Sequence, residues 1–434
     1  MGAMAFRADG TLWGHPKGLF VLFLTEMWER FSYYGMRSLL VYYMVKHLMF
    51  SQSAASQIYG LYTGLVYLTP FLGGALADRV IGRRKAVIIG AIVMAAGHFM
   101  MAFESLFIGA LIFLVIGNGF FKPNISTQVG ELYTVGDSRR DSAFSIFYVG
   151  INLGAFFSPL ICGTLGEVYG WHYGFSAAGT GMILGLIVYL FGKKWLGFDS
   201  HDGYKIFKQH SVESLPGDEK QRLWVLLAVG LVTAAFWAAY EQQGNTIALW
   251  ADAYTERRVM GMQIPASWFQ SLNPAFIFVL TPMVTSFWSW RSRKGKEPAA
   301  ISKMAFGCFL LGLGFLVMAP AAIFYSVGGT PVGMSWLITF NLLVTLGELY
   351  LSPVGLSLVT KLSPTRMVSM IMGAWFLSSF FGNYGAGFLG QYWEKMAKEN
   401  FFLMIAMIAF MACFFMLLIR VWMKRISKLN IQTY

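Results

Sequence analysis

The amino-acid sequence predicts an all-α polytopic membrane protein. Of its 434 residues, 56% are hydrophobic and only 12% are charged, whereas about a quarter of the residues in a soluble domain are charged. The apolar residues come in blocks of roughly twenty or more, which is long enough to cross about 30 Å of hydrocarbon as helices. Because helices satisfy their own backbone hydrogen bonds in lipid, this pattern indicates a bundle of transmembrane helices.

Twelve such blocks follow one another between charged or Gly/Pro-rich breaks. The first six cover residues 18–49, 58–77, 85–103, 107–127, 143–166 and 173–190. The second six cover residues 223–242, 266–290, 301–324, 333–360, 367–392 and 401–423. The longest polar connection separates the two sets. We therefore expect an N-terminal six-helix bundle over residues 1–191, a linker over 192–222 and a C-terminal six-helix bundle over 223–434.

The basic residues predict the orientation of these spans. Most of the 33 Lys and Arg residues lie in loops on the side that holds both termini and the linker. The opposite loops hold only Lys46, Arg257, Arg258, Lys395 and Lys398. By the positive-inside rule, both termini and the linker are expected to be cytoplasmic. The formal net charge of +12 then follows from topology, and no nucleic-acid partner is expected.

Two further features exclude other classes of protein. Cys162, Cys308 and Cys413 all lie inside apolar blocks, so neither a disulfide framework nor a metal site is expected. The first dozen residues are interrupted by the charges of Arg7 and Asp9, and the apolar run that follows them is too long for the core of a signal peptide. We expect no cleavable signal, and targeting by the first helix itself.

The first apolar block carries the charges that are most difficult to bury. Glu26, Arg30, Tyr33 and Arg37 recur at helical spacing and share one face of a helix, with Glu29 beside them. A charge in a bilayer costs a few kcal/mol or more unless it faces a polar interior, so this stripe is a candidate functional site. A structural ion pair that locks two helices is the alternative interpretation.

Few polar side chains interrupt the other eleven blocks. They are Lys122, Asn152, Glu241, Asn273 and Glu348. The bases all lie in the first half of the chain, whereas the second half supplies two acids and no buried base.

This division of charge suggests a substrate. A cavity between the halves would be positive on one wall and negative on the other, which suits a small zwitterion. Its carboxylate would bind Arg37 and Lys122 and its ammonium would bind Glu348, with Asn152 and Asn273 offering amide hydrogen bonds. Several desolvated carboxylates among opposing charges also suit proton coupling.

The connection over residues 73–85 supports a transporter architecture. It reads Gly-Gly-Ala-Leu-Ala-Asp-Arg-Val-Ile-Gly-Arg-Arg-Lys and resembles the signature loop of major facilitator transporters, in which two six-helix halves rock about a central site. We expect Asp78 to pair across the domain interface with the basic cluster formed by Arg83, Arg84 and Lys85. A plain stop-transfer run of charges is the alternative.

Five segments resemble one branch of that superfamily. Residues 26–35 read Glu-Met-Trp-Glu-Arg-Phe-Ser-Tyr-Tyr-Gly and resemble the E-x-x-E-R-F-x-Y-Y-G motif of the proton-dependent oligopeptide transporter family. Residues 144–154 resemble the fifth-helix signature of that family. Residues 121–124, 241–242 and 347–349 resemble its fourth, seventh and tenth helices. The resemblance covers nearly the whole chain.

The resemblance implies a symporter that imports di- and tripeptides with protons across a bacterial inner membrane by alternating access. It implies a monomer that is not an enzyme and needs no cofactor other than the coupling proton. By the same resemblance Glu26, Glu29 and Arg30 couple proton binding to transport. Glu241 would pair with Arg37 until it is protonated.

The resemblance also implies a set of substrate-binding residues, in which Lys122 opposes Glu348. The residues are Tyr33, Tyr34, Arg37, Tyr67, Lys122, Asn152, Asn273, Glu348, Ser352 and Trp375. For Tyr67 and Trp375, a role as packed aromatics is the alternative.

Two departures from the family pattern stand out. Many bacterial members carry two extra helices between the halves, but residues 197–222 are too few for two spans, so either these helices are absent or the recorded chain lacks residues. The second block has no histidine, unlike that of animal members, and His98 in the third block is expected to be structural.

Other functions remain to be weighed against peptide symport. The same fold could carry nitrate or another small metabolite, although an anion would have little use for Glu348. An intramembrane enzyme or a receptor lacks support, because the spans contain no nucleophile with a nearby base and no paired catalytic histidine and acid.

Overall fold

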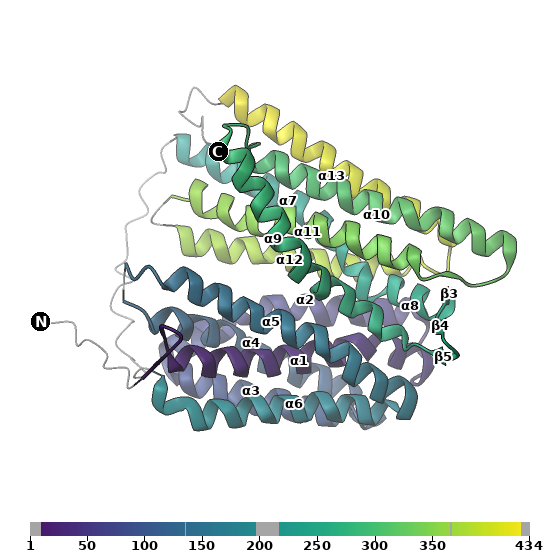
Figure 1. The fold of residues 1–434 in the computed structure, drawn as a ribbon, viewed down its shortest axis with the longest axis horizontal. Helices are drawn as coiled ribbons and strands as arrows, with labels where there is room; N and C mark the ends of the chain where they lie inside the picture. The colour runs from purple at the N-terminus through teal and green to yellow at the C-terminus, as the bar shows by residue number, and fades with distance from the viewer. Residues whose placement is uncertain (1–9, 135, 197–216, 365–366, 427–434) are drawn as a thin grey trace, which may run out of the picture. The chain divides into compact units, whose positions relative to one another are not determined.

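The computed structural model describes residues 10–134, 136–196, 217–364 and 367–426 (Figure 1). The predicted all-α class is confirmed, because the described part of the chain holds 12 long helices. Nine segments within it are long and apolar enough to cross a membrane. The protein is therefore a multi-pass membrane protein.

Each predicted block corresponds to one long helix. The first six are α1 (Lys17–Lys46), α2 (Gln52–Leu76), α3 (Arg83–Met100), α4 (Phe107–Glu131), α5 (Arg140–Thr164) and α6 (Trp171–Gly192). The next six are α7 (Gly217–Tyr240), α9 (Leu272–Arg293), α10 (Ala300–Gly328), α11 (Ser335–Leu362), α12 (Val368–Gly390) and α13 (Lys398–Ile426).

Short elements connect these helices. Besides the eight-residue helix α8 (Thr246–Ala253), they are the π-helical turns Ala77–Ile81 and Leu165–Tyr169 and the 3-10 turns Glu104–Leu106, Lys193–Trp195, Glu241–Gly244 and Ala266–Ser271. The strands are β1 (Thr11–Leu12), β2 (His15–Pro16), β3 (Thr255–Glu256), β4 (Arg258–Val259), β5 (Met262–Gln263) and β6 (Val332–Gly333). The pairs β1–β2 and β4–β5 are antiparallel, and β3–β6 is parallel.

The chain divides into two compact units. Unit 1 comprises Met1–Leu39 and Leu68–His210, and unit 2 comprises Leu40–Tyr67 and Ser211–Tyr434. The end of α1 and the first part of α2 are thus counted with the second half of the chain. The domain bounds expected at residues 191 and 223 stay a prediction, and most of the expected linker lies outside the described residues.

Unit 1 is built closely around α1. A Cβ atom at Gly154 of α5 would lie 2.2 Å from the carbonyl oxygen of Met27 and 3.0 Å from Cβ of Arg30. The α1 and α5 backbones therefore approach each other more closely than any larger residue would permit. On the α6 side, the Ser32 hydroxyl donates to the carbonyl oxygen of Ala178 at 2.7 Å. The charged part of α1 is fixed by both neighbours.

The helix α4 is held in the same way between α3 and the second part of α2. A Cβ atom at Gly117 would lie 2.8 Å from the carbonyl oxygen of Gly90, so the α3 and α4 backbones are also in close contact. The Thr69 hydroxyl donates to the carbonyl oxygen of Val115 at 3.0 Å. This packing fixes the register of the polar residues further along α4.

The connection over residues 73–85 is almost entirely helical. The π-helical turn Ala77–Ile81 within it ends at Gly82, whose φ of 85° permits the sharp turn into α3. Arg83 bonds Asp78 at 2.9 Å and also pairs with Glu131 at the end of α4. The expected pairing of Asp78 with the basic cluster is present. The expectation that it crosses the domain interface is wrong, because the turn at Gly82 brings Arg83 back to Asp78 within unit 1.

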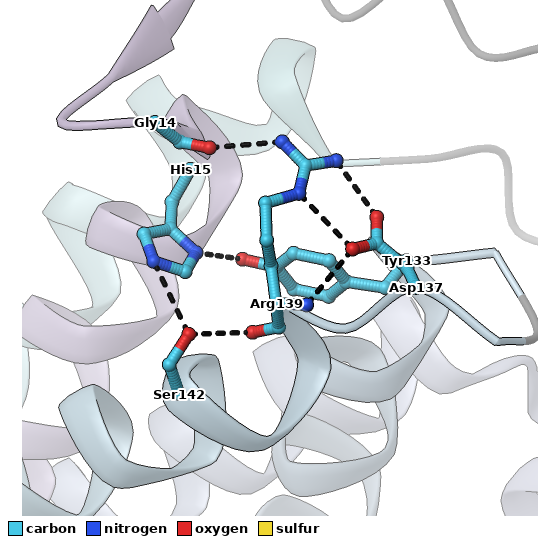
Figure 2. A network of polar contacts seen from close by, with 6 residues as sticks. All are labelled: Gly14, His15, Tyr133, Asp137, Arg139 and Ser142. Atoms are coloured by element: carbon cyan, nitrogen blue, oxygen red, sulfur yellow. Dashed lines mark hydrogen bonds and ion pairs between the residues drawn. The ribbon is translucent and has the colours of Figure 1, made fainter.

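A two-stranded hairpin, β1–β2, precedes α1 and is hydrogen-bonded to the α4–α5 connection (Figure 2). Arg139 donates to the carbonyl oxygen of Gly14 at 2.9 Å, and the His15 Nδ1 lies 2.8 Å from the Tyr133 hydroxyl. Arg139 also binds Asp137 at 2.7 Å. These hydrogen bonds lower the pKa of Asp137 to about 2. The network joins the entry of α1 to the rest of unit 1.

In unit 2, α10 and α13 run side by side along their length (Figure 1). A break follows α7, where the 3-10 turn Glu241–Gly244 leads into α8. Three contacts from the ends of α1 and α2 hold this region. Lys46 pairs with Asp252 at 2.6 Å, the Tyr42 hydroxyl donates to the carbonyl oxygen of Ala248, and Ser56 donates to the Asn245 side chain.

Candidate functional site

Glu26, Glu29 and Arg30 of α1 form one ionic cluster in unit 1, here called the α1 charge cluster. Arg30 Nε lies 2.5 Å from Glu29 Oε2 and 3.1 Å from Glu26 Oε1. The three residues are only 2%, 0% and 4% exposed, respectively. Two acids thus share one base, and the cluster by itself carries a net negative charge when both carboxylates are ionised.

Two side chains from α4 complete the surroundings of this cluster. Asn118 Nδ2 donates to Glu29 Oε1 at 3.5 Å. Lys122, one turn further along, is close enough for its charge to act on both Glu26 and Glu29. The close contact of α4 with α2 and α3 places both residues here, so the second base that the sequence places in this half lies within electrostatic reach of the two acids.

The cluster keeps one carboxylate oxygen without a partner. Glu26 Oε2 is buried and accepts no hydrogen bond from the described residues. A buried acceptor in this state is costly. A proton can bind there without displacing any of the contacts just described.

Aromatic rings continue the stripe along α1. The Arg30 guanidinium lies 5.4 Å from the centre of the Tyr33 ring, and that of Arg37 lies 5.8 Å from the Tyr34 ring. The two tyrosine rings meet edge to face at 5.1 Å. Arg37 is thus separated by one pair of rings from the α1 charge cluster and has a different immediate environment.

Asn152, the remaining candidate in unit 1, lies on α5. Its Nδ2 donates to the carbonyl oxygen of Tyr148 at 2.9 Å, one turn earlier in the same helix. The side chain is buried. Its role in binding substrate stays a prediction.

In unit 2, a second carboxylate is held in a different manner. Glu348 of α11 accepts hydrogen bonds at Oε2 from the Tyr240 hydroxyl, at 2.7 Å, and from Asn273 Nδ2, at 2.9 Å. Asn273 Nδ2 also lies 3.0 Å from the Tyr240 hydroxyl and 3.1 Å from the Thr345 hydroxyl. We call these four residues the Glu348 site. It joins the end of α7, the start of α9 and the middle of α11.

Glu241 lies next to this site in sequence, at the break that follows α7. It is buried and opens the 3-10 turn. The following residue, Gln242, fixes the turn, because it donates to the carbonyl oxygen of Ala386 at 2.9 Å and accepts from the Thr246 hydroxyl at 2.8 Å. The break therefore has a fixed geometry. It begins at Glu241, the residue that follows Tyr240 at the end of α7.

The last three candidates lie on three helices. Trp375 of α12 is 8% exposed, and a Cβ atom at Gly355 of α11 would lie 2.5 Å from its ring. Ser352 of α11 and Tyr67 of α2 are partly exposed. The close packing of Trp375 on α11 agrees with the alternative of a packed aromatic and leaves its role in binding a prediction.

The structure thus brings part of the expected set together in two groups, with Lys122 near the α1 charge cluster in unit 1 and Asn273 on Glu348 in unit 2. Asn118, Tyr240 and Thr345 belong to these groups, and the sequence analysis did not single them out. Two of them carried a signal, since Asn118 lies one helical turn before Lys122 and Tyr240 directly precedes Glu241. The expected pairs Arg37–Glu241 and Lys122–Glu348 stay predictions.

The fold and these sites define a class of protein. A polytopic helical membrane protein that buries ionisable side chains in several helices and breaks one of them beside a buried acid has the features of a secondary transporter. Within the described residues, no group of three or more His, Cys, Asp or Glu side chains is placed to hold a metal ion.

The comparisons with known proteins give the family. A model of the POT family matches residues 84–216 and 200–405, and the chain belongs to this family. The peptide transporter YePEPT of Yersinia enterocolitica is 36% identical, with 88% of each chain covered. A di-/tripeptide transporter of Lactococcus lactis is 33% identical over 86% of this chain and 88% of its own.

A solved structure agrees with this family assignment and with the fold. The crystal structure of a peptide transporter POT in complex with sulfate is 33% identical, covers 96% of both chains and superposes with a TM-score of 0.88. Family and fold were therefore predicted correctly from the sequence motifs.

Proposed function

We propose that the chain is a proton-coupled symporter that imports di- and tripeptides by alternating access. The observation that carries this proposal is the presence of two differently compensated carboxylate sites in one fold. The α1 charge cluster holds two acids around one base, and among the described residues the Glu348 site holds one acid by neutral donors only. The named activities of the relatives support the same substrate class.

The two sites take different roles in this proposal. Glu26, Glu29 and Arg30 couple proton binding to transport: one of the two carboxylates takes up the proton beside the permanently charged Arg30, which neutralises the excess negative charge of the cluster. Glu348 binds the peptide ammonium, since its negative charge is not cancelled by a described basic side chain. Arg37 and Lys122 bind the peptide carboxylate, and protonation of Glu241 releases Arg37.

The remaining assignments complete the proposal. Tyr33, Tyr34, Tyr67, Asn152, Asn273, Ser352 and Trp375 contact the peptide. The protein acts as a monomer in a bacterial inner membrane with both termini cytoplasmic, uses no cofactor besides the proton and catalyses no chemical reaction. One charge that moves through 100 mV supplies about 2.3 kcal/mol, which suffices to concentrate a solute roughly fiftyfold.

Uptake of a labelled dipeptide into proteoliposomes tests this function. We expect uptake to require an inward proton gradient or a negative internal potential, and to fall when either is collapsed by an ionophore. A panel of unlabelled di-, tri- and tetrapeptides, free amino acids and nitrate should compete in that assay, with di- and tripeptides strongest. Equal peptide flux without any gradient would refute symport. Failure of every dipeptide to compete would refute the substrate class.

A further inference from the structure

Tyr240 occupies a position that links the two acids of unit 2. It is the last residue of α7, it immediately precedes Glu241, and its hydroxyl donates to Oε2 of Glu348 at 2.7 Å. Its ring stacks on the Phe236 ring, with 5.9 Å between the ring centres, and meets the Trp237 ring edge to face at 5.1 Å. The hydroxyl is therefore presented to Glu348 by a ring that is itself packed in place.

The hydrogen bonds to Glu348 are distributed unequally between its two oxygens. Both described donors, Tyr240 and Asn273, end on Oε2. Asn273 in turn is oriented by the Thr345 hydroxyl at 3.1 Å. Oε1 receives no hydrogen bond from the described residues. It is not among the fully buried atoms that lack a partner, and the Glu348 side chain is half-buried. One oxygen thus fixes the carboxylate, and the other remains as an acceptor.

We propose that Tyr240 is a positioning residue that fixes the Glu348 carboxylate through Oε2, so that Oε1 accepts the substrate ammonium. This inference rests on the proposed function and adds a residue that determines specificity for a charged amino terminus. A carboxylate on a flexible side chain loses rotational freedom when it binds a cation. Neutral donors that restrain it beforehand reduce that loss and leave its charge intact.

The experiment compares Tyr240→Phe with the wild type in proteoliposomes. The substitution removes the hydroxyl and keeps the ring packed on its neighbours. We expect KM for a dipeptide with a free amino terminus to rise about tenfold, while the maximal rate of peptide counterflow stays within about twofold. KM for the N-acetylated dipeptide should be unchanged, because that substrate brings no ammonium to Glu348.

A matched control and a second variant separate this role from a structural one. Tyr189→Phe removes another buried hydroxyl, which donates to Gln128 at 2.9 Å, and should leave both KM values unchanged. In a Glu348→Gln background, Tyr240→Phe should add no further change in KM, since it acts through that carboxylate. This comparison remains informative if Tyr240→Phe alone lowers expression.

The outcomes distinguish this inference from the function on which it rests. If the wild type transports no peptide, the proposed function fails. If the wild type is active and Tyr240→Phe keeps the wild-type KM, the positioning role is wrong. An equal rise in KM for the free and acetylated dipeptides, or additive effects of Tyr240→Phe and Glu348→Gln, would also overturn it, because either result describes a general structural defect.

Discussion

The α1 charge cluster and the Glu348 site both hold carboxylates between helices, but they compensate the charge in opposite ways. In the cluster, a guanidinium lies between two acids and almost no solvent reaches them. At the Glu348 site, a hydroxyl and an amide hold one oxygen, and the described residues form no ion pair with the acid. In the α1 charge cluster, protonation of one acid changes the net charge around Arg30. At the Glu348 site, the carboxylate keeps its negative charge available for an incoming cation.

The difference has consequences for stability as well as for binding. Removing one member of a buried ion pair leaves its partner charged and uncompensated, which is strongly destabilising. Removing the charge of an acid held by neutral donors leaves those donors with an acceptor of nearly the same shape. Substitutions should therefore damage folding at the first site and ligand recognition at the second.

The largest effect is expected for Arg30→Met. It leaves Glu26 and Glu29 as adjacent buried acids, so the free energy of unfolding should fall by about 3–5 kcal/mol, measured by denaturant titration in detergent micelles. Adding Glu29→Gln to this variant should recover part of the loss. Wild-type stability in Arg30→Met would show that the cluster is not an energetically coupled unit.

Glu348→Gln should show the opposite pattern. Its side-chain carbonyl can still accept from Tyr240 and Asn273, so the free energy of unfolding should change by less than about 1 kcal/mol. KM for dipeptides with a free amino terminus should rise by about ten- to hundredfold, because a charge-assisted hydrogen bond is lost. Uptake kinetics and the same denaturant titration measure both quantities. An unchanged KM would remove the distinction between the two sites.

A smaller effect is expected for Gly154→Ala, which disturbs the packing behind the α1 charge cluster without touching a charge. The new methyl group would lie 2.2 Å from the Met27 carbonyl oxygen, so α5 must move away from α1 at a cost of about 1–3 kcal/mol. The control is Gly230→Ala in α7, where nothing lies within 4 Å of the new Cβ atom. It should be neutral or slightly stabilising, and equal losses in both variants would argue against a specific close approach.

The smallest effect is expected for the exposed ion pair of Asp137 and Arg139. Asp137→Asn should leave transport and global unfolding unchanged and should speed backbone hydrogen exchange only in residues 11–16. The pKa of Asp137 is lowered from 3.8 to about 2, so its contribution is complete above about pH 4 and is lost as the pH falls toward 2. The difference in hairpin protection between the wild type and Asp137→Asn, corrected for intrinsic exchange rates, should therefore be equal at pH 5 and pH 7.

Much of this molecule could be predicted from its sequence, because in a bilayer the apolar blocks and the charges between them leave few choices. All 12 long helices were expected, with bounds that differ by at most six residues, and the grouping of Glu26, Glu29 and Arg30 followed from helical spacing alone. The short helix α8 was missed, since residues 243–265 contain no apolar block long enough to span. Thr345 was missed because a single hydroxyl in an apolar helix has no distinctive sequence pattern, and the position of Tyr240 directly before Glu241 does not by itself reveal its partner on α11. Their partners come from helices far apart in the chain.

The contrast between the two sites is tested most directly by peptide-driven acidification of proteoliposomes that contain a pH-sensitive dye. Addition of a dipeptide to the wild type should acidify the interior. Glu29→Gln should abolish acidification while counterflow of the labelled dipeptide continues, whereas Glu348→Gln should weaken both together and recover both at high peptide concentration. If Glu29→Gln still acidifies the interior as the wild type does, the α1 charge cluster is not the site of proton coupling and the account is contradicted.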